Sequence, residues 1–279
     1  MRVLRTRAEL RAALADVPRP LGLVPTMGWL HTGHRSLMAR ARAENATTIA
    51  SIFVNPRQFN EAADYQRYPR NEAHDLAICE EEGLDLVFAP AVEEIYPPGF
   101  DTVVSVGTVA RPLEGAARPG HFDGVATVVA ILFNLVGAER AYFGQKDAQQ
   151  VLVIRQMARD LAIRTEVIAC PTVREPDGLA LSSRNVHLSP DQRAAAPVLR
   201  RALLEARARW EGGERSGEAL RAAMSEVLAG EALATPAYVS VADGRTLAEL
   251  DDVPDGVPTL LSLAVRLGST RLIDNELLV

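Results

Sequence analysis

Short hydrophobic runs rich in β-branched side chains recur along the first part of the chain. They lie at residues 21–24, 47–54, 84–88, 140–143 and 163–168. Between them, hydrophobic residues recur with the 3.6-residue spacing of a helix, at residues 35–43, 71–82, 125–135 and 148–161. This alternation predicts an α/β fold, a parallel sheet with helices on both faces. The runs are almost continuously hydrophobic, as expected of strands that are buried on both faces.

The pattern changes near Pro171. Residues 173–185 are polar and rich in turn formers, which predicts a hinge or a mobile loop. Alanine-rich helical segments follow at residues 191–210 and 217–228, and alternating strands at residues 237–241 and 259–267. We therefore predict two domains, a parallel α/β domain in residues 1–172 and a smaller α+β domain in residues 173–279.

Composition excludes several classes of protein. Of the 279 residues, 48% are hydrophobic and 24% charged, as in ordinary soluble proteins. A net charge of −6 gives no electrostatic reason to expect a nucleic-acid partner. The most apolar stretch, residues 125–136, is shorter than the roughly 20 residues that span a membrane. Cys79 and Cys170 lack metal-ligand spacing, so we expect buried thiols in a soluble, cytoplasmic protein.

A histidine pair lies where a predicted strand gives way to a helix. The strand ends at Pro25, and the helix is expected to begin close to His34. Open α/β sheets bind ligands at the carboxyl ends of their strands, where the next helix presents free N–H groups to phosphate. Gly28 and Gly33 permit tight turns there. His31 and His34, when protonated, could stabilise a leaving pyrophosphate. The alternative is one helix cap and one surface histidine.

Lys146 follows a second short strand and precedes a second helix. Its charge could neutralise phosphates, while Asp147 suits the first turn of a helix. Alternatively, the lysine is a solvated surface residue and the aspartate only a cap. Two such junctions in one sheet favour a functional role. Neither a GxGxxG motif after a strand nor a GxxxxGK[ST] motif is present.

Two hydroxyls, a guanidinium and two amides complete the candidate set. Ser182, Ser183 and Arg184 lie in the turn-rich loop and could close over a triphosphate, although a polar linker would look the same. Gln58 and Gln150 could bond the hydroxyl or carboxylate of a substrate without adding charge. Buried structural glutamines are an equally good interpretation.

Four motifs in this order resemble the pantothenate synthetase (pantoate–β-alanine ligase) family, within the HxGH nucleotidyltransferase superfamily. They are Val-Pro-Thr-Met-Gly-x-Leu-His-x-Gly-His at residues 24–34, Ser-Ile-Phe-Val-Asn-Pro-x-Gln-Phe at 51–59, Phe-Gly-x-Lys-Asp-x-Gln-Gln at 143–150 and Ser-Ser-Arg-Asn at 182–185. The resemblance extends over nearly the whole chain, including Thr-Arg-Leu-Ile-Asp-Asn at 270–275.

The resemblance implies an AMP-forming ligase of pantothenate biosynthesis, which supplies a precursor of coenzyme A. ATP and pantoate would give pantoyl adenylate and pyrophosphate, and β-alanine would then give pantothenate and AMP. It also implies Mg²⁺, a Rossmann-like, doubly wound N-terminal domain that binds ATP and pantoate, a C-terminal lid domain and a homodimer. It supplies no metal-ligating residue.

Roles carried over from the family cover three overlapping sets of residues. His31, His34, Lys146 and Arg184 are the implied catalytic residues, with His34 as proton donor. The implied ATP contacts are Met27, Gly28, His31, Gly33, His34, Gly144, Lys146, Asp147, Val173, Leu181, Ser182, Ser183 and Arg184. The implied pantoate contacts are Pro25, Met27, Phe53, Gln58, Val125, Val128, Val129 and Gln150, with Gln58 also near β-alanine.

Two departures and two rival functions are part of this interpretation. Family members often carry an aromatic residue at position 148 and methionine at position 181, where this chain has Ala148 and Leu181. The leucine is nearly isosteric, whereas the alanine reduces the bulk beside the pocket. One rival is a nucleotidyltransferase that leaves its nucleotide on the product. The other is a regulatory module that binds a nucleotide without chemistry.

Overall fold

The computed structural model describes residues 1–60 and 62–279, which divide into two compact units. The first unit comprises Met1–Gly144 and Gln149–Pro171. The second comprises Thr172–Val279 together with the short segment Gln145–Ala148. Lys146 therefore belongs, by its contacts, to the second unit.

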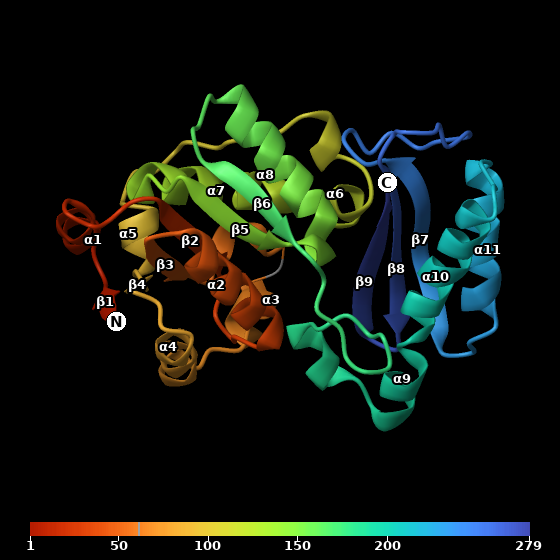
Figure 1. Ribbon diagram of the computed structural model, residues 1–279. Helices are drawn as coiled ribbons and strands as arrows, with labels where there is room; N and C mark the ends of the chain where they lie inside the picture. The colour runs from red at the N-terminus through yellow and green to blue at the C-terminus, as the bar shows by residue number, and fades with distance from the viewer. Residues whose placement is uncertain (61) are drawn as a thin grey trace. The chain divides into compact units, whose positions relative to one another are not determined.

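A six-stranded parallel sheet forms the centre of the first unit (Figure 1). Its strand order is β1-β4-β3-β2-β5-β6. The strands are β1 (Arg2–Leu4), β2 (Leu21–Thr26), β3 (Thr47–Ile52), β4 (Leu86–Phe88), β5 (Arg140–Gly144) and β6 (Glu166–Cys170). The predicted parallel α/β sheet is confirmed.

Helices cover both faces of this sheet (Figure 1). Leu23 packs in a core with residues of α1 (Arg7–Leu14), α7 (His121–Val136) and α8 (Ala148–Asp160). Its neighbour Val24 points to the opposite face, into a core with α2 (Thr32–Glu44) and α4 (Glu72–Glu81). Successive residues of a strand face opposite sides, so the sheet is doubly wound, as predicted. Shorter helical elements are η1 (Pro56–Gln58), α3 (Ala62–Arg67), α5 (Val92–Ile95), η2 (Thr108–Ala110) and α6 (Glu114–Ala117).

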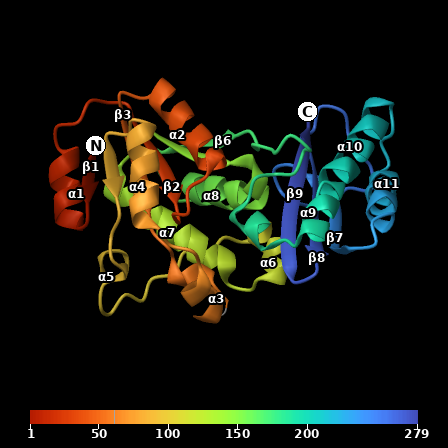
Figure 2. The same ribbon diagram turned by 90° about the horizontal axis from the view of Figure 1, so that it is seen from below.

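An antiparallel sheet of three strands forms the second unit, in the order β7-β8-β9. The strands are β7 (Ala234–Asp243), β8 (Thr259–Leu267) and β9 (Thr270–Leu278). Helices α10 (Val198–Glu211) and α11 (Gly217–Ala229) pack on one face of it (Figure 2). The unit also contains η3 (Gln145–Asp147), η4 (Ser183–His187) and α9 (Pro190–Ala195).

The structure differs from the sequence prediction at several elements. The predicted helix 191–210 is two helices, α9 and α10, because Pro197 between them has no N–H to continue the first. The strand predicted at residues 163–168 begins only at Glu166, and β4 begins only at Leu86. Strands β1 and β9 were not predicted. They are edge strands of their sheets, and β1 has three residues.

Both cysteines are free and buried, as predicted. Burial raises the pKa of the Cys79 thiol to about 12 and also raises the pKa of Cys170. Within the described residues, no helix is long and apolar enough to cross a membrane.

Candidate functional site

The turn between β2 and α2 is built around a buried carboxylate. Gly28 and Trp29 both have left-handed backbone angles, with φ of 79° and 52°. Asp75 of α4 is 1% exposed and accepts hydrogen bonds from Trp29 N at 2.9 Å and Leu30 N at 2.7 Å. A Cβ on Gly28 would lie 2.7 Å from Asp75 Oδ2, so glycine is required on steric as well as conformational grounds.

His31 and His34 then begin helix α2. His31 is the N-cap, and its Nδ1 accepts a hydrogen bond from Gly33 N at 3.1 Å. His34 Nδ1 accepts one from His31 N at 3.3 Å, which completes a capping box. The ring centroids are 4.2 Å apart. A Cβ on Gly33 would lie 2.9 Å from His31 Cε1, so the ring packs directly over this glycine.

These contacts decide which nitrogen of each ring carries the proton. A ring nitrogen that accepts a hydrogen bond is unprotonated, so the neutral imidazole holds its hydrogen on Nε2. Both rings therefore offer Nε2–H as donor at the N-terminus of a thirteen-residue helix, where the helix dipole favours an anion. The capping alternative is confirmed for His31, and it is compatible with binding of phosphate.

Gln58 is held against helix α7. Its side chain is buried, and Oε1 accepts a hydrogen bond from Asn55 Nδ2 at 3.1 Å. Asn55 also accepts one from Tyr96 Oη at 2.8 Å, and burial raises the pKa of this phenol, which keeps it a neutral donor. A Cβ on Gly124 of α7 would lie 2.2 Å from Arg57 O, so the main chain of η1 lies directly on the helix.

The backbone of Gln58 has two basic neighbours. Its carbonyl oxygen lies 2.8 Å from His121 Nδ1 and 3.2 Å from Arg118 Nη2. These contacts, with the bond from Asn55, fix both ends of the residue. The side-chain amide nitrogen of Gln58, Nε2, makes no hydrogen bond to another residue within 1–60 or 62–279.

The apolar residues expected around pantoate lie beside Gln58. Phe53, Val125, Val128 and Val129 belong to one buried cluster. The valines share a face of α7, since they follow its 3.6-residue period. Phe53 N donates to Thr26 O at 3.0 Å, which joins this wall to the strand that leads into the histidine turn. Pro25 ends no strand but lies within β2, half-buried, and Met27 follows the strand.

The two neighbouring glutamines of the third motif have different surroundings. Gln149 is buried and bonds the backbone of three residues, with Oε1 3.0 Å from Glu114 N and Nε2 3.0 Å from Val109 O and 2.8 Å from Pro112 O. It is structural. Gln150 is half-buried, and its carboxamide bonds no other residue in the described part of the chain, which leaves it the better candidate for a ligand.

Most of the Lys146 side chain is buried. Its side chain is 15% exposed, and Nζ lies 3.9 Å from Asp147 Oδ1. The backbone carbonyls of Gln145 and Lys146 accept hydrogen bonds from Asn275 Nδ2 at 3.0 and 2.9 Å. Asp147 ends η3 and is half-exposed, and Gly144 ends β5 just before this segment. The segment is thus attached to β9.

Residues 173–185 form an internally bonded hairpin followed by η4. Leu181 N donates to Val173 O at 3.0 Å, and Arg174 forms an antiparallel bridge with Ala180. Ser182 then caps η4, since its hydroxyl accepts from Arg184 N at 3.3 Å. Ser183 and Arg184 lie in the first turn of η4, and Arg184 is exposed.

The structure therefore assembles the candidate residues in two groups. In the first unit, the histidine turn, Gln58 and the apolar wall lie at adjoining strand ends. In the second, the Lys146 segment and the hairpin are both bonded to β9. Sequence reasoning missed Asp75, Asn275 and Asp274 as supports of these groups. Asp75 gave one usable signal, a lone acidic residue in the apolar face of a predicted helix.

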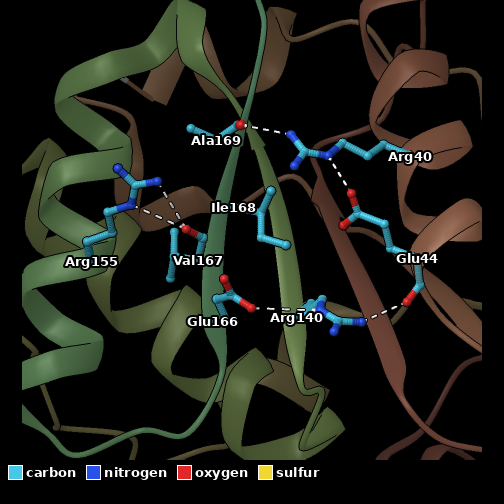
Figure 3. Close-up of a pocket in the computed structure, with 8 residues that line it drawn as sticks. All are labelled: Arg40, Glu44, Arg140, Arg155, Glu166, Val167, Ile168 and Ala169. Atoms are coloured by element: carbon cyan, nitrogen blue, oxygen red, sulfur yellow. Dashed lines mark hydrogen bonds and ion pairs between the residues drawn. The ribbon is translucent and has the colours of Figure 1, made fainter. Parts of the chain in front are cut away.

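A surface pocket of the first unit contains none of the predicted residues. It is lined by Arg40, Glu44, Arg140, Arg155, Glu166, Val167, Ile168 and Ala169 (Figure 3). Arg40 donates to Glu44 at 2.9 Å and to Ala169 O at 3.1 Å, and Arg155 donates to Val167 O at 3.2 Å. These arginines bond carboxylates and carbonyls of the protein itself, so we assign the pocket a structural role.

The fold and the histidine turn define a doubly wound α/β protein with a candidate ligand site at the carboxyl ends of its parallel strands. Comparison identifies the family. The sequence profile described as pantoate-beta-alanine ligase matches residues 2–277, and the chain belongs to this family. It is therefore an enzyme of the ligase class.

Relatives and solved structures agree with this assignment. The chain is 60% identical to a pantothenate synthetase of Roseiflexus castenholzii, over all of this chain and 99% of the relative. It matches the crystal structure of pantothenate synthetase from Thermus thermophilus with a TM-score of 0.93 and 51% identity, covering 99% of each chain. It also matches pantoate-beta-alanine ligase from Francisella tularensis, solved with beta-gamma ATP and beta-alanine, with a TM-score of 0.80 and 34% identity. That match covers 99% of this chain and 97% of the other.

Proposed function

We propose that the enzyme condenses pantoate with β-alanine through a pantoyl-adenylate intermediate. A carboxylate oxygen of pantoate attacks the α-phosphorus of ATP, and the bond to the bridging oxygen of pyrophosphate breaks. The amine of β-alanine then attacks the acyl carbon, loses a proton and displaces AMP. The products are pantothenate, pyrophosphate and AMP.

The observation that carries this proposal is the histidine turn. Two Nε2–H donors at a helix N-terminus suit a phosphate chain whose negative charge grows as pyrophosphate leaves. His34 lies in the first turn of α2, and its proposed role is to donate a hydrogen bond from Nε2–H to the leaving pyrophosphate, with His31 as a phosphate contact. Met27, Gly28 and Gly33 complete the ATP contacts of this turn.

Residues of the second unit neutralise the remaining phosphate charge in this proposal. Lys146 and Arg184 supply cations, and the hydroxyls of Ser182 and Ser183 supply hydrogen bonds. Gly144, Asp147, Val173 and Leu181 contact the nucleotide. We propose that residues 1–172 bind ATP and pantoate and that residues 173–279 act as a lid, which would shield the acyl-adenylate from water.

Pantoate is held by amides and by an apolar wall. Gln58 and Gln150 bond its hydroxyl and carboxylate oxygens, and Gln58 also serves β-alanine. Its geminal methyl groups contact a wall of six residues, Pro25, Met27, Phe53, Val125, Val128 and Val129. The fixed carboxamide of Gln58 supports this role, because a positioned amide orients the acid without neutralising the attacking oxygen.

Mg²⁺ enters this proposal with ATP. Among residues 1–60 and 62–279, no three histidine, cysteine, aspartate or glutamate side chains form a group that could hold a metal ion. Mg²⁺ takes most of its ligands from substrate phosphates and water in many such sites, so in this proposal it is bound by ATP. We further propose that the protein is cytoplasmic, from its composition and cysteines, and a homodimer, from the family resemblance.

ATP–pyrophosphate exchange tests the proposal. Labelled pyrophosphate should enter ATP only when pantoate is present, and addition of β-alanine should release AMP together with pantothenate. Absence of pantoate-dependent exchange would refute adenylation. A product that retained the nucleotide would support the transferase alternative instead.

A further inference from the structure

Two consecutive residues of β9 contact the Lys146 segment and the hairpin of the second unit. Asp274 and Asn275 are 3% and 5% exposed. Successive residues of a strand point to opposite faces of its sheet. Leu272 and Leu278 of the same strand face the core with α10, so Asp274 faces that side and Asn275 the other.

Asp274 binds the hairpin. Arg174 donates to Asp274 in a bidentate pair, with distances of 2.6 and 3.0 Å. The same guanidinium donates to Gly178 O at 3.1 Å, across the turn of the hairpin. Leu179 of this turn is buried in the helix-side core. The course of the chain into Ser182 and Arg184 is thereby set by a buried ion pair.

Asn275 binds the Lys146 segment. Its Nδ2 donates to Gln145 O at 3.0 Å and to Lys146 O at 2.9 Å, and its Oδ1 lies 3.4 Å from Gln145 Nε2. One carboxamide therefore holds two successive carbonyls of η3. An aspartate of the same shape could not replace it, because its carboxylate would face two carbonyl oxygens.

We propose that Asp274 and Asn275 are a positioning pair for adenylation. Asn275 N donates to Asp274 Oδ1 at 2.8 Å. One short stretch of strand therefore fixes the Lys146 segment relative to the hairpin that leads into Arg184. Neither residue is placed against substrate. The pair thus binds the segment that carries one cation and the hairpin that leads into the other to a single strand. This inference rests on the function proposed above and assigns Asp274 and Asn275 a part in that function.

The two half-reactions provide the test, because only the first uses the triphosphate. Asn275→Asp should lower kcat/KM for ATP in pantoate-dependent pyrophosphate exchange by roughly 10- to 100-fold, as expected for a small displacement of a charged group. The reaction of supplied pantoyl adenylate with β-alanine should stay within about twofold of wild type. Asp274→Asn should show the same split.

Ser262→Ala is the matched control. Ser262 is the partner of Asn275 on β8, faces the same side of the sheet, is buried and makes no hydrogen bond through its hydroxyl in the described chain. Both half-reactions should be unchanged in this variant. If Asn275→Asp does not fold, Asn275→Ser, which keeps one hydroxyl donor, is read by the same criterion.

Three outcomes separate the possibilities. Exchange that is unaltered in the Asn275 and Asp274 variants would overturn the positioning pair, as would an equal fall in both half-reactions, the mark of a purely structural role. Wild-type enzyme without pantoate-dependent exchange would instead refute the proposed function itself.

Discussion

The histidine turn and the Lys146 segment are held in place in different ways. The imidazoles are fixed mainly by their own neighbours, since each Nδ1 bonds a backbone N–H two or three residues away. The Lys146 segment is fixed by Asn275, about 130 residues further along the chain. A site built from local contacts is visible as a motif, whereas one built from distant contacts leaves only isolated polar residues in the sequence.

The largest effect is expected from removing the locally held donor. His34→Ala should slow pantoate-dependent pyrophosphate exchange roughly 10²–10³-fold, because the variant loses the proposed hydrogen-bond donor to the leaving pyrophosphate. The fold should persist, since the side chain is only half-buried and lies in the first turn of α2, outside the buried clusters. Exchange kinetics and thermal unfolding together measure both expectations.

His74→Ala is a suitable control for that variant. His74 is exposed on α4 of the same unit and has no part in the proposed site. It should behave as wild type. Near-normal exchange in His34→Ala would remove His34 from its role and would show that the local contacts serve only the helix cap.

An intermediate effect is expected at Asp75, which supports the histidine turn from helix α4. Asp75→Asn replaces one of two acceptor oxygens with an amide NH₂ group, which is a donor that faces a backbone N–H. The substitution should therefore lower the free energy of unfolding by about 2 kcal/mol. Exchange should fall roughly tenfold as the turn relaxes. Urea unfolding and exchange assays measure the two effects.

The exposed Asp101→Asn serves as its control and should change neither quantity. If Asp75→Asn destabilised the protein but left exchange intact, the capping bonds alone would be sufficient to place the histidines. That result would make the contrast between the two segments sharper still.

The smallest effect concerns the attachment of β9 to its helices. Burial alone would raise the pKa of Glu276, but hydrogen bonds from Arg200 and Arg207 of α10 hold it below its usual value. A lowered folded-state pKa adds stability above the unfolded value, near 4.3, and that stability is lost as the pH falls through the folded value.

Glu276→Gln should therefore cost about 1 kcal/mol at pH 7. The difference from wild type should shrink as the pH falls from about 5 toward the lowered pKa of Glu276. Urea unfolding of both proteins across this range measures it. A difference that stayed constant with pH would assign the effect to packing rather than to charge.

Much of the fold could be predicted because its signals are local. Continuous apolar runs marked β2 and β3, and helical periodicity marked α7 and α8. β9 escaped because Asp274, Asn275 and Glu276 interrupt its apolar pattern, and their burial depends on Arg174, Arg200 and other distant partners. Polar residues that are buried only through long-range partners cannot be told from a loop in the sequence.

The candidate site shows the same difference between residues with local signals and residues that depend on distant partners. Histidines, glycines and the Lys-Asp dipeptide could be singled out from their spacing. The structural role of Gln149 could not, because it depends on carbonyls of Val109 and Pro112 some 40 residues away. The assignment of Gln145–Ala148 to the second unit was equally invisible.

In the proposed pantoate site, the contact between Gly124 and the main chain at Arg57 limits how substrate specificity could be changed. Side chains can be trimmed to enlarge a binding site, but here the helix already presents only a hydrogen atom to the opposing carbonyl. A substitution at Gly124 can add atoms at this contact but cannot remove any. Redesign for a bulkier acid would have to begin one helical residue later, at Val125, where there is a side chain to shorten.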